Sequence, residues 1–241
     1  SADSMQIYRG MDIGTAKPTA QERSLAVHHM IDVADPWEDY SVARYVEEAS
    51  ACCDSLLEEG KTPVIVGGTG LYIESLLSGR DFAPRDHEGE ARRRYSDMYD
   101  SLGGELMLER LRPLDPEKAE KLHPNDKKRI VRAFEVLEEG ESLSDHDAAT
   151  SEKKPRYSAA VVVLNFKDRQ ELYRRIDLRV DQMMDQGLVG EVEGLLADGL
   201  SMENTAMQAI GYKEIAAALK GGGDIDRAVE KIKRGSRRYG K

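Results

Sequence analysis

Three polar side chains that could do chemistry lie close together near the start of the sequence. Asp3, Ser4 and Gln6 fall within one short segment. If Asp3 ends a strand, these side chains lie at the carboxyl edge of a parallel sheet, where open α/β sheets bind ligands. A carboxylate there could accept a proton, and the hydroxyl and amide could hydrogen-bond the edge of a base. The alternative is an Asx turn in which Asp3 only caps the following segment, and the residues alone leave both interpretations open.

A glycine-rich turn, Gly67-Gly68-Thr69-Gly70, is a second candidate site. It follows a short apolar run at residues 62–66, and an apolar helical pattern comes after it. Glycines allow backbone N–H groups to approach a phosphate, the N-terminus of a helix favours an anion, and Thr69 adds a hydroxyl. The turn is not a Walker motif, because no Gly-Lys-Ser/Thr ends it. Many strand-to-helix turns have this composition, so the motif alone is weak evidence for a phosphate site.

The formal net charge of −10 argues against nucleic-acid binding, but the basic residues are concentrated in clusters. The clusters are Arg92, Arg93 and Arg94; Lys127, Lys128, Arg129 and Arg132; and Lys231, Lys233, Arg234, Arg237, Arg238 and Lys241. A polyanion could bind them, because local field matters more than net charge. Lys128, Arg129 and Arg132 can share one side of a helix that Asn125 or Asp126 would cap. The alternative is a set of solvated helix faces.

The cysteines and histidines predict neither a disulfide nor a metal site. Cys52 and Cys53 are adjacent, as are His28 and His29, and adjacent side chains rarely bridge or share a metal. Reduced thiols are typical of a cytosolic protein, and no apolar run approaches the length of a membrane span. We therefore expect a cytoplasmic protein with no signal peptide, no membrane segment and no metal ligand among its own residues.

The pattern of apolar residues predicts an α/β fold with a parallel sheet flanked by helices. Residues 62–66 and 157–164 are valine-rich runs, which are typical of buried strands. Residues 42–56 have apolar residues at helical spacing, and Ser41 is a candidate N-cap for them. Two further helical segments follow near the end of the chain, with an expected bend at Gly187.

The middle of the chain has a different character. From about residue 88 to residue 140 it is highly charged, with a helical pattern and no strand signal, which indicates a helical insertion. A polar return at residues 141–155 leads back to the sheet. We therefore expect an α/β core formed by residues 1–84 and 156–241, interrupted by a helical domain at residues 85–155.

Six stretches of the sequence, taken in order, resemble the bacterial tRNA dimethylallyltransferase (tRNA isopentenyltransferase) family. They are residues 1–18, which end Asp12-Ile13-Gly14-Thr15-Ala16-Lys17-Pro18; His28-His29-Met30-Ile31-Asp32-Val33 with residues 35–43; Val66-Gly67-Gly68-Thr69-Gly70-Leu71-Tyr72; His123-Pro124-Asn125-Asp126 with Arg129 and Arg132; residues 172–188; and Gln208-Ala209-Ile210-Gly211-Tyr212-Lys213-Glu214. Any one block could mislead, but six in the family's order cover nearly the whole chain and are very specific.

The resemblance implies a P-loop-type parallel α/β core of the nucleotide- and ATP-binding class, with an inserted helical domain that grips the anticodon stem-loop of tRNA. It implies transfer of a dimethylallyl group from dimethylallyl diphosphate to the exocyclic amine of the adenosine 3′-adjacent to the anticodon, with Mg²⁺ as cofactor. It implies no obligate protein partner.

The resemblance also implies roles for individual residues. Asp3 falls where the family has its general base, and Thr69 where it has a hydroxyl beside the reaction centre. The residues expected to contact tRNA are Asp3, Ser4, Met5, Gln6, Thr69, Arg92, Lys128, Arg129 and Arg132. Those expected to contact the diphosphate are Gly67, Gly68 and Arg238.

The sequence departs from the family pattern at both ends. The family pattern starts with a strand and a Gly-x-x-x-x-Gly-Lys-Ser/Thr loop that cradles the diphosphate, and the present sequence starts after that point. It stops at Tyr239-Gly240-Lys241, where the pattern continues with Arg-Gln and an aromatic segment. We expect residues 1–241 alone to lack the main diphosphate cradle and a central strand. Catalysis by these residues alone should be impaired, whereas a longer parent protein should be active.

Two other functions remain open from the sequence. One is a P-loop transferase that prenylates free adenine nucleotides to make cytokinin precursors. The helical insertion and the basic clusters favour tRNA over this substrate, and an assay of tRNA against AMP would discriminate the two. The other is an RNA-binding module without catalytic activity.

Overall fold

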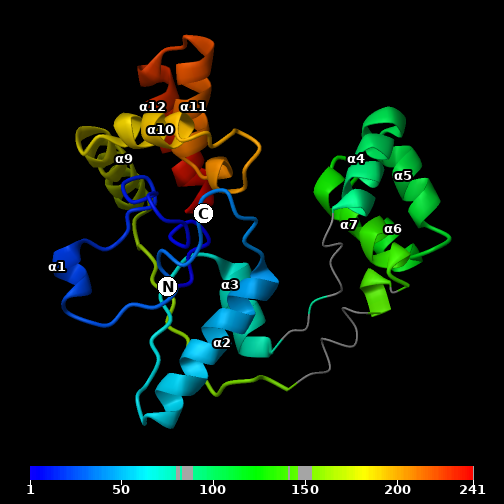
Figure 1. The fold of residues 1–241 in the computed structure, drawn as a ribbon, viewed down its shortest axis with the longest axis horizontal. Helices are drawn as coiled ribbons and strands as arrows, with labels where there is room; N and C mark the ends of the chain where they lie inside the picture. The colour runs from blue at the N-terminus through cyan, green and yellow to red at the C-terminus, as the bar shows by residue number, and fades with distance from the viewer. Residues whose placement is uncertain (80–81, 83–88, 141, 146–153, 241) are drawn as a thin grey trace. The chain divides into compact units, whose positions relative to one another are not determined.

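The computed structural model describes residues 1–79, 82, 89–140, 142–145 and 154–240. The chain divides into two compact units, each with its own set of helices (Figure 1). The first unit contains Ser1–Leu76 and Ala159–Lys241, and the second contains Leu77–Ser158. Most of the polar return predicted at residues 141–155 lies outside the described residues.

The first unit contains seven α-helices and one 3₁₀ helix in its described residues, and local capping explains where some of them begin. They are α1 (Ala20–Arg23), α2 (Val42–Glu58), α3 (Gly70–Ser78), α9 (Arg169–Asp185), α10 (Leu188–Ala197), the 3₁₀ helix η1 (Ala206–Gln208), α11 (Tyr212–Gly221) and α12 (Ile225–Tyr239). The prediction that Ser41 caps α2 is confirmed, because its hydroxyl accepts a hydrogen bond from Arg44 N at 3.2 Å. The predicted bend is also confirmed, since α9 gives way to α10 at Gly187, whose φ of +99° favours glycine.

Four of these helices form a packed bundle in the C-terminal part of the first unit (Figure 1). Helix α12 packs against α9 and α11, and α10 packs against α9 and α11. The buried side chains between them include Val180, Met183, Leu188, Val192, Leu195, Ile215 and Ile232. Burial of each large aliphatic side chain contributes about 1.5–3 kcal/mol to the stability of the fold. We therefore expect this bundle to be a stable part of the unit that positions the loops next to it.

The predicted buried strands are not confirmed in the described residues. Residues 62–66 and 157–164 contain no assigned strand, and the one β-bridge in the described chain is a parallel pair between Tyr8 and Ala34. Val64 is 80% exposed and Val162 is 82% exposed. A strand needs a neighbour that satisfies its backbone groups, and the run at 62–66 has only the bond from Ala2 N to Val66 O, at 2.7 Å, within the described chain.

The second unit is helical, as predicted for about residues 88–140. Its helices are α4 (Glu90–Leu102), α5 (Gly104–Leu111), α6 (Pro116–Lys121) and α7 (Lys127–Glu138). The buried core of α5, α6 and α7 consists of Met107, Leu108, Leu111, Ala119, Ile130, Ala133 and Phe134, and partly buried side chains of α4 pack against it. Asp126 is the N-cap of α7 and accepts a hydrogen bond from Arg129 N at 3.3 Å. This cap fixes where the basic cluster at the start of α7 begins.

Candidate active site

Asp3 forms an Asx turn and still keeps one carboxylate oxygen available. Its Oδ1 accepts hydrogen bonds from Met5 N at 2.8 Å and Gln6 N at 3.3 Å. Oδ2 has no hydrogen-bond partner in the described part of the chain. The two interpretations of the sequence are therefore compatible, because one oxygen holds the turn and the other can accept a proton.

The glycine-rich turn lies directly against this N-terminal segment. Ser4 N donates to Thr69 Oγ1 at 3.0 Å, and the Thr69 hydroxyl lies 3.3 Å from Ser4 Oγ. The backbone is joined as well, because Thr69 N donates to Ala2 O at 3.1 Å. A Cβ on Gly67 would lie only 2.2 Å from Ala2 O, so this close approach requires glycine. The contacts bring Thr69 beside Asp3 from 66 positions further along the chain.

Gln6 is held by a different part of the chain. Its Nε2 donates to Thr15 O at 3.2 Å and to Ala16 O at 3.3 Å. Its Oε1 accepts from Ser1 Oγ at 2.9 Å. The four consecutive residues expected to contact the target nucleotide, Asp3, Ser4, Met5 and Gln6, thus form one half-buried turn whose polar groups are fixed from two sides.

The residues predicted to bind diphosphate lie near the C-terminal end of α12. Tyr239 OH donates to Gly68 O at 3.0 Å, which joins α12 to the glycine-rich turn. The N–H groups of Gly67 and Gly68 have no protein acceptor in the described chain, and both residues are exposed. Arg238 is exposed and makes no ion pair with any described residue. These donors are available to an anion at the start of α3.

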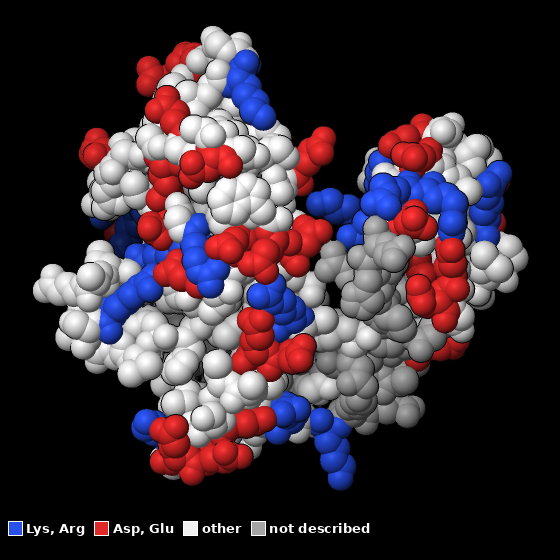
Figure 2. Space-filling view, viewed as in Figure 1, with Lys and Arg blue, Asp and Glu red and all other residues white. Residues whose placement is uncertain are grey.

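The predicted tRNA-binding arginines of the second unit are organised around a buried carboxylate. Glu135, whose side chain is 1% exposed, lies 3.2 Å from Arg92 Nη2 and 3.6 Å from Arg132 Nη1. Lys128 and Arg129 are exposed on the first turn of the same helix, α7. Figure 2 shows Lys and Arg side chains gathered in a band on one face of this unit, with Asp and Glu side chains beside it.

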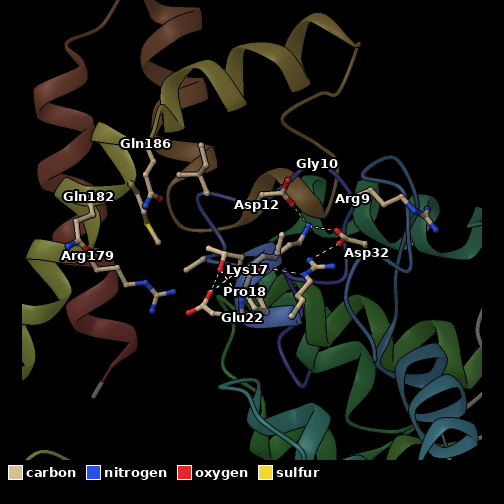
Figure 3. Close-up of a pocket in the computed structure, with 16 residues that line it drawn as sticks. Arg9, Gly10, Asp12, Lys17, Pro18, Glu22, Asp32, Arg179, Gln182 and Gln186 are labelled. Atoms are coloured by element: carbon tan, nitrogen blue, oxygen red, sulfur yellow. Dashed lines mark hydrogen bonds and ion pairs between the residues drawn. The ribbon is translucent and has the colours of Figure 1, made fainter. Parts of the chain in front are cut away.

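A cavity of about 1020 Å³ lies in the first unit between the segment 9–23 and helix α9 (Figure 3). Lys17 is buried in its wall, where Nζ donates to Tyr8 O at 2.5 Å, Asp12 Oδ1 at 2.9 Å and Asp32 Oδ1 at 2.6 Å. Burial opposes ionisation of Asp32, but hydrogen bonds from Lys17 and Arg23 outweigh it, so the pKa of Asp32 is lowered.

Helix α9 contributes a cation to the same cavity. Arg179 projects from α9 toward the segment that carries Lys17 and Glu22 (Figure 3). The sequence does not single out Arg179, Lys17 or Asp32, although all three lie within stretches that resemble the family. No isolated motif marks them, because each depends on partners from other segments.

The described residues contain no group of three or more His, Cys, Asp and Glu side chains that could hold a metal ion. Among the described helices, none is both long enough and apolar enough to cross a bilayer.

Comparison with known proteins identifies the family. The IPP transferase family matches residues 6–241. The tRNA dimethylallyltransferase of Caldanaerobacter subterraneus subsp. tengcongensis is 46% identical over 243 residues, which cover 100% of this chain and 77% of that protein. The crystal structure of a tRNA isopentenylpyrophosphate transferase from Bacillus halodurans is similar, with 36% identity and a TM-score of 0.67, and covers 99% of this chain and 74% of its own.

A eukaryotic dimethylallyltransferase, solved in the course of acting on tRNA, has a TM-score of 0.76 and 26% identity over 99% of this chain and 60% of its own. The family model, the related sequences and the solved structures thus all match this chain over almost its full length. The chain belongs to the IPP transferase family.

Proposed function

We propose that this protein transfers a dimethylallyl group from dimethylallyl diphosphate to the exocyclic amine of the adenosine 3′-adjacent to the anticodon in tRNA. The observation that carries the proposal is the position of the Thr69 hydroxyl on Ser4, the residue next to Asp3, whose Oδ2 has no hydrogen-bond partner among the described residues, in a chain of the IPP transferase family. The similarity to a eukaryotic enzyme solved acting on tRNA supports the choice of substrate.

Asp3 is the proposed general base. An adenine amine is a weak nucleophile, because its lone pair is delocalised into the ring. In the transfer, a C–N bond forms between the amine and the allylic carbon, and the C–O bond to the diphosphate breaks. The amine proton passes to Asp3 Oδ2 as the C–N bond forms, which removes the positive charge that would otherwise build on nitrogen. Oδ1 keeps its two backbone hydrogen bonds throughout.

Thr69 is proposed to orient the reacting groups. Its oxygen already accepts the Ser4 N–H, so the hydroxyl hydrogen can be donated either to Ser4 Oγ or to a substrate oxygen. The target adenine must leave its stack to reach this turn, as in other enzymes that modify bases.

The leaving diphosphate is proposed to contact Gly67, Gly68 and Arg238. Backbone N–H donors at the start of a helix and a nearby cation stabilise an anion as its charge develops. Mg²⁺ remains our predicted cofactor, since it commonly binds through phosphate oxygens. The described residues do not form a metal site by themselves, so no residue of this chain is assigned to the ion.

The second unit is proposed to bind the anticodon stem-loop through Arg92, Lys128, Arg129 and Arg132. Glu135 would hold Arg92 and Arg132 at one place, so that their remaining N–H groups face phosphates. We also propose that residues 1–84 and 156–241 form the catalytic core and residues 85–155 the tRNA-binding domain. A P-loop-type parallel sheet in that core stays part of the proposal, supported by the TM-scores to the family's solved structures.

The direct test offers labelled dimethylallyl diphosphate to the full-length protein with either tRNA or AMP as acceptor. We expect label in tRNA and none in AMP. Transfer to AMP alone would instead support a free-nucleotide prenyltransferase. Tight tRNA binding without transfer to either acceptor would support an RNA-binding module.

A further inference from the structure

We propose that Glu191 and Tyr212 are positioning residues that set base specificity. They fix the turn at residues 12–16 so that its carbonyl groups hold the Gln6 amide in one orientation, with the amide oxygen toward the target base. This inference rests on the proposed function, and it concerns how the same site distinguishes adenine from other purines.

Four donors converge on the Glu191 carboxylate. Oε2 accepts from the backbone N–H groups of Asp12 and Ile13, both at 2.9 Å. Oε1 accepts from Gly14 N at 3.3 Å and from the Tyr212 hydroxyl. The three backbone donors belong to one turn and the carboxylate belongs to α10, 177 to 179 positions away. Hydrogen bonds to an ionised acceptor are among the strong ones, so this carboxylate anchors the turn to the helical bundle.

Tyr212 also fixes the turn by shape. Its side chain is fully buried, and a Cβ on Gly14 would lie 2.4 Å from Cε2 of its ring. The same Cβ would lie 2.9 Å from Leu188 Cδ1. The turn therefore packs closely against a buried aromatic ring at a position where a Cβ would clash. Burial, followed by the neighbouring Glu191 charge, raises the pKa of Tyr212, so its hydroxyl stays a donor to Glu191.

The turn at residues 12–16 determines how the Gln6 amide is oriented. Two carbonyl oxygens, Thr15 O and Ala16 O, lie within hydrogen-bond distance of one end of the amide. Carbonyl oxygens can only accept, so the NH₂ end must face them and the oxygen must face the other way. That oxygen accepts from the Ser1 hydroxyl at 2.9 Å, and in the proposed complex the target base takes the place of this hydroxyl as donor. Gln6 N also bonds Asp3 Oδ1, so the oriented amide belongs to the proposed catalytic turn.

An amide oxygen held in this way selects for a donor. The exocyclic amine of adenine can donate to it, whereas inosine has a carbonyl oxygen at the same position and would place two acceptors face to face. If the turn at 12–16 is released, the amide can rotate and offer its NH₂ end to inosine. Loss of Glu191 should therefore reduce discrimination between the two bases.

The experiment measures the Kd of two anticodon stem-loop RNAs that differ only in carrying adenosine or inosine at the target position. The proteins are the full-length wild type, Glu191→Ala, Tyr212→Phe and a matched control, Glu193→Ala. Glu193 is an exposed carboxylate on the same helix. We expect the wild type to prefer adenosine and the preference to fall by about five- to tenfold in Glu191→Ala. The fall should be about two- to threefold in Tyr212→Phe, and Glu193→Ala should keep the wild-type ratio.

The ratio separates positioning from general stability, because a variant that is merely less well folded loses affinity for both RNAs equally. An unchanged ratio in Glu191→Ala would overturn the inference. If that variant does not fold, an unchanged ratio in a folded Tyr212→Phe would do the same. Equal binding of both RNAs by the wild type would also overturn it while leaving the proposed function intact. A wild type that binds neither RNA would overturn both.

Discussion

Replacement of Asp3 with Asn should leave the fold and substrate binding intact and slow the chemical step. Asn retains an oxygen that can accept the hydrogen bonds from Met5 N and Gln6 N, at 2.8 and 3.3 Å in the native turn. The other terminal atom becomes an NH₂ group, which cannot take a proton. General-base catalysis contributes about 10²- to 10⁴-fold in rate, which corresponds to a barrier increase of about 2.7–5.4 kcal/mol.

The assay is a single-turnover reaction of the full-length protein, with tRNA and dimethylallyl diphosphate both saturating, because this condition separates chemistry from binding and product release. Thr69→Ala is the companion variant, and its effect should be smaller, since water can partly replace a hydroxyl. A wild-type single-turnover rate in Asp3→Asn would show that Asp3 is only the cap of an Asx turn, and the proposed mechanism would be wrong.

Three further predictions follow from the geometry. The double variant Lys128→Ala, Arg129→Ala should bind tRNA more weakly. The slope of log K against log salt concentration should become less steep by about 0.7–0.9 for each phosphate contact that is lost, while affinity for dimethylallyl diphosphate stays constant. An unchanged slope would mean that these residues form a solvated helix face. Gly14→Ala should lower thermal stability by about 1–3 kcal/mol through overpacking against Tyr212, and unchanged melting would contradict the close contact. The folded-state pKa of Asp32 is lowered, because cationic partners outweigh burial. Its stabilisation should therefore be present above the unfolded pKa and lost as pH falls through the folded value, so acid melting curves of Asp32→Asn should converge on those of the wild type.

Local signals predicted the helices well. Ser41 and Asp126 cap α2 and α7 because a short oxygen side chain before a helical pattern has one favourable use, to accept from the exposed N–H groups of the first turn. Gly187 separates α9 from α10 for a similarly local reason, its positive φ. In each case the physical cause lies within four residues of the signal.

The strands show the limit of the same reasoning. The valine-rich runs at residues 62–66 and 157–164 have the composition of buried strands, but burial and pairing depend on neighbours that composition does not provide. In the described chain these runs lack a paired strand, and Val64 and Val162 are largely exposed. An apolar run shows that a segment can form a buried strand, and the neighbouring segments determine whether it does.

Only part of the candidate site could be predicted from the sequence, because some of its residues are brought together only by the fold. Asp3, Ser4 and Gln6 are adjacent in sequence, so their proximity was evident, and Thr69 was linked to Asp3 only by resemblance to the family. Glu191 carries no motif at all. Its role arises from backbone donors nearly 180 positions away, a relationship that no local pattern encodes.

The most direct test of the account maps the product. Unmodified tRNA is incubated with the full-length protein and dimethylallyl diphosphate, cleaved with a base-specific nuclease, and analysed by mass spectrometry of the fragments and nucleosides. We expect one dimethylallyl group on the exocyclic amine of the adenosine 3′-adjacent to the anticodon. A tRNA that stays unmodified, or a prenyl group at a different base, would contradict it.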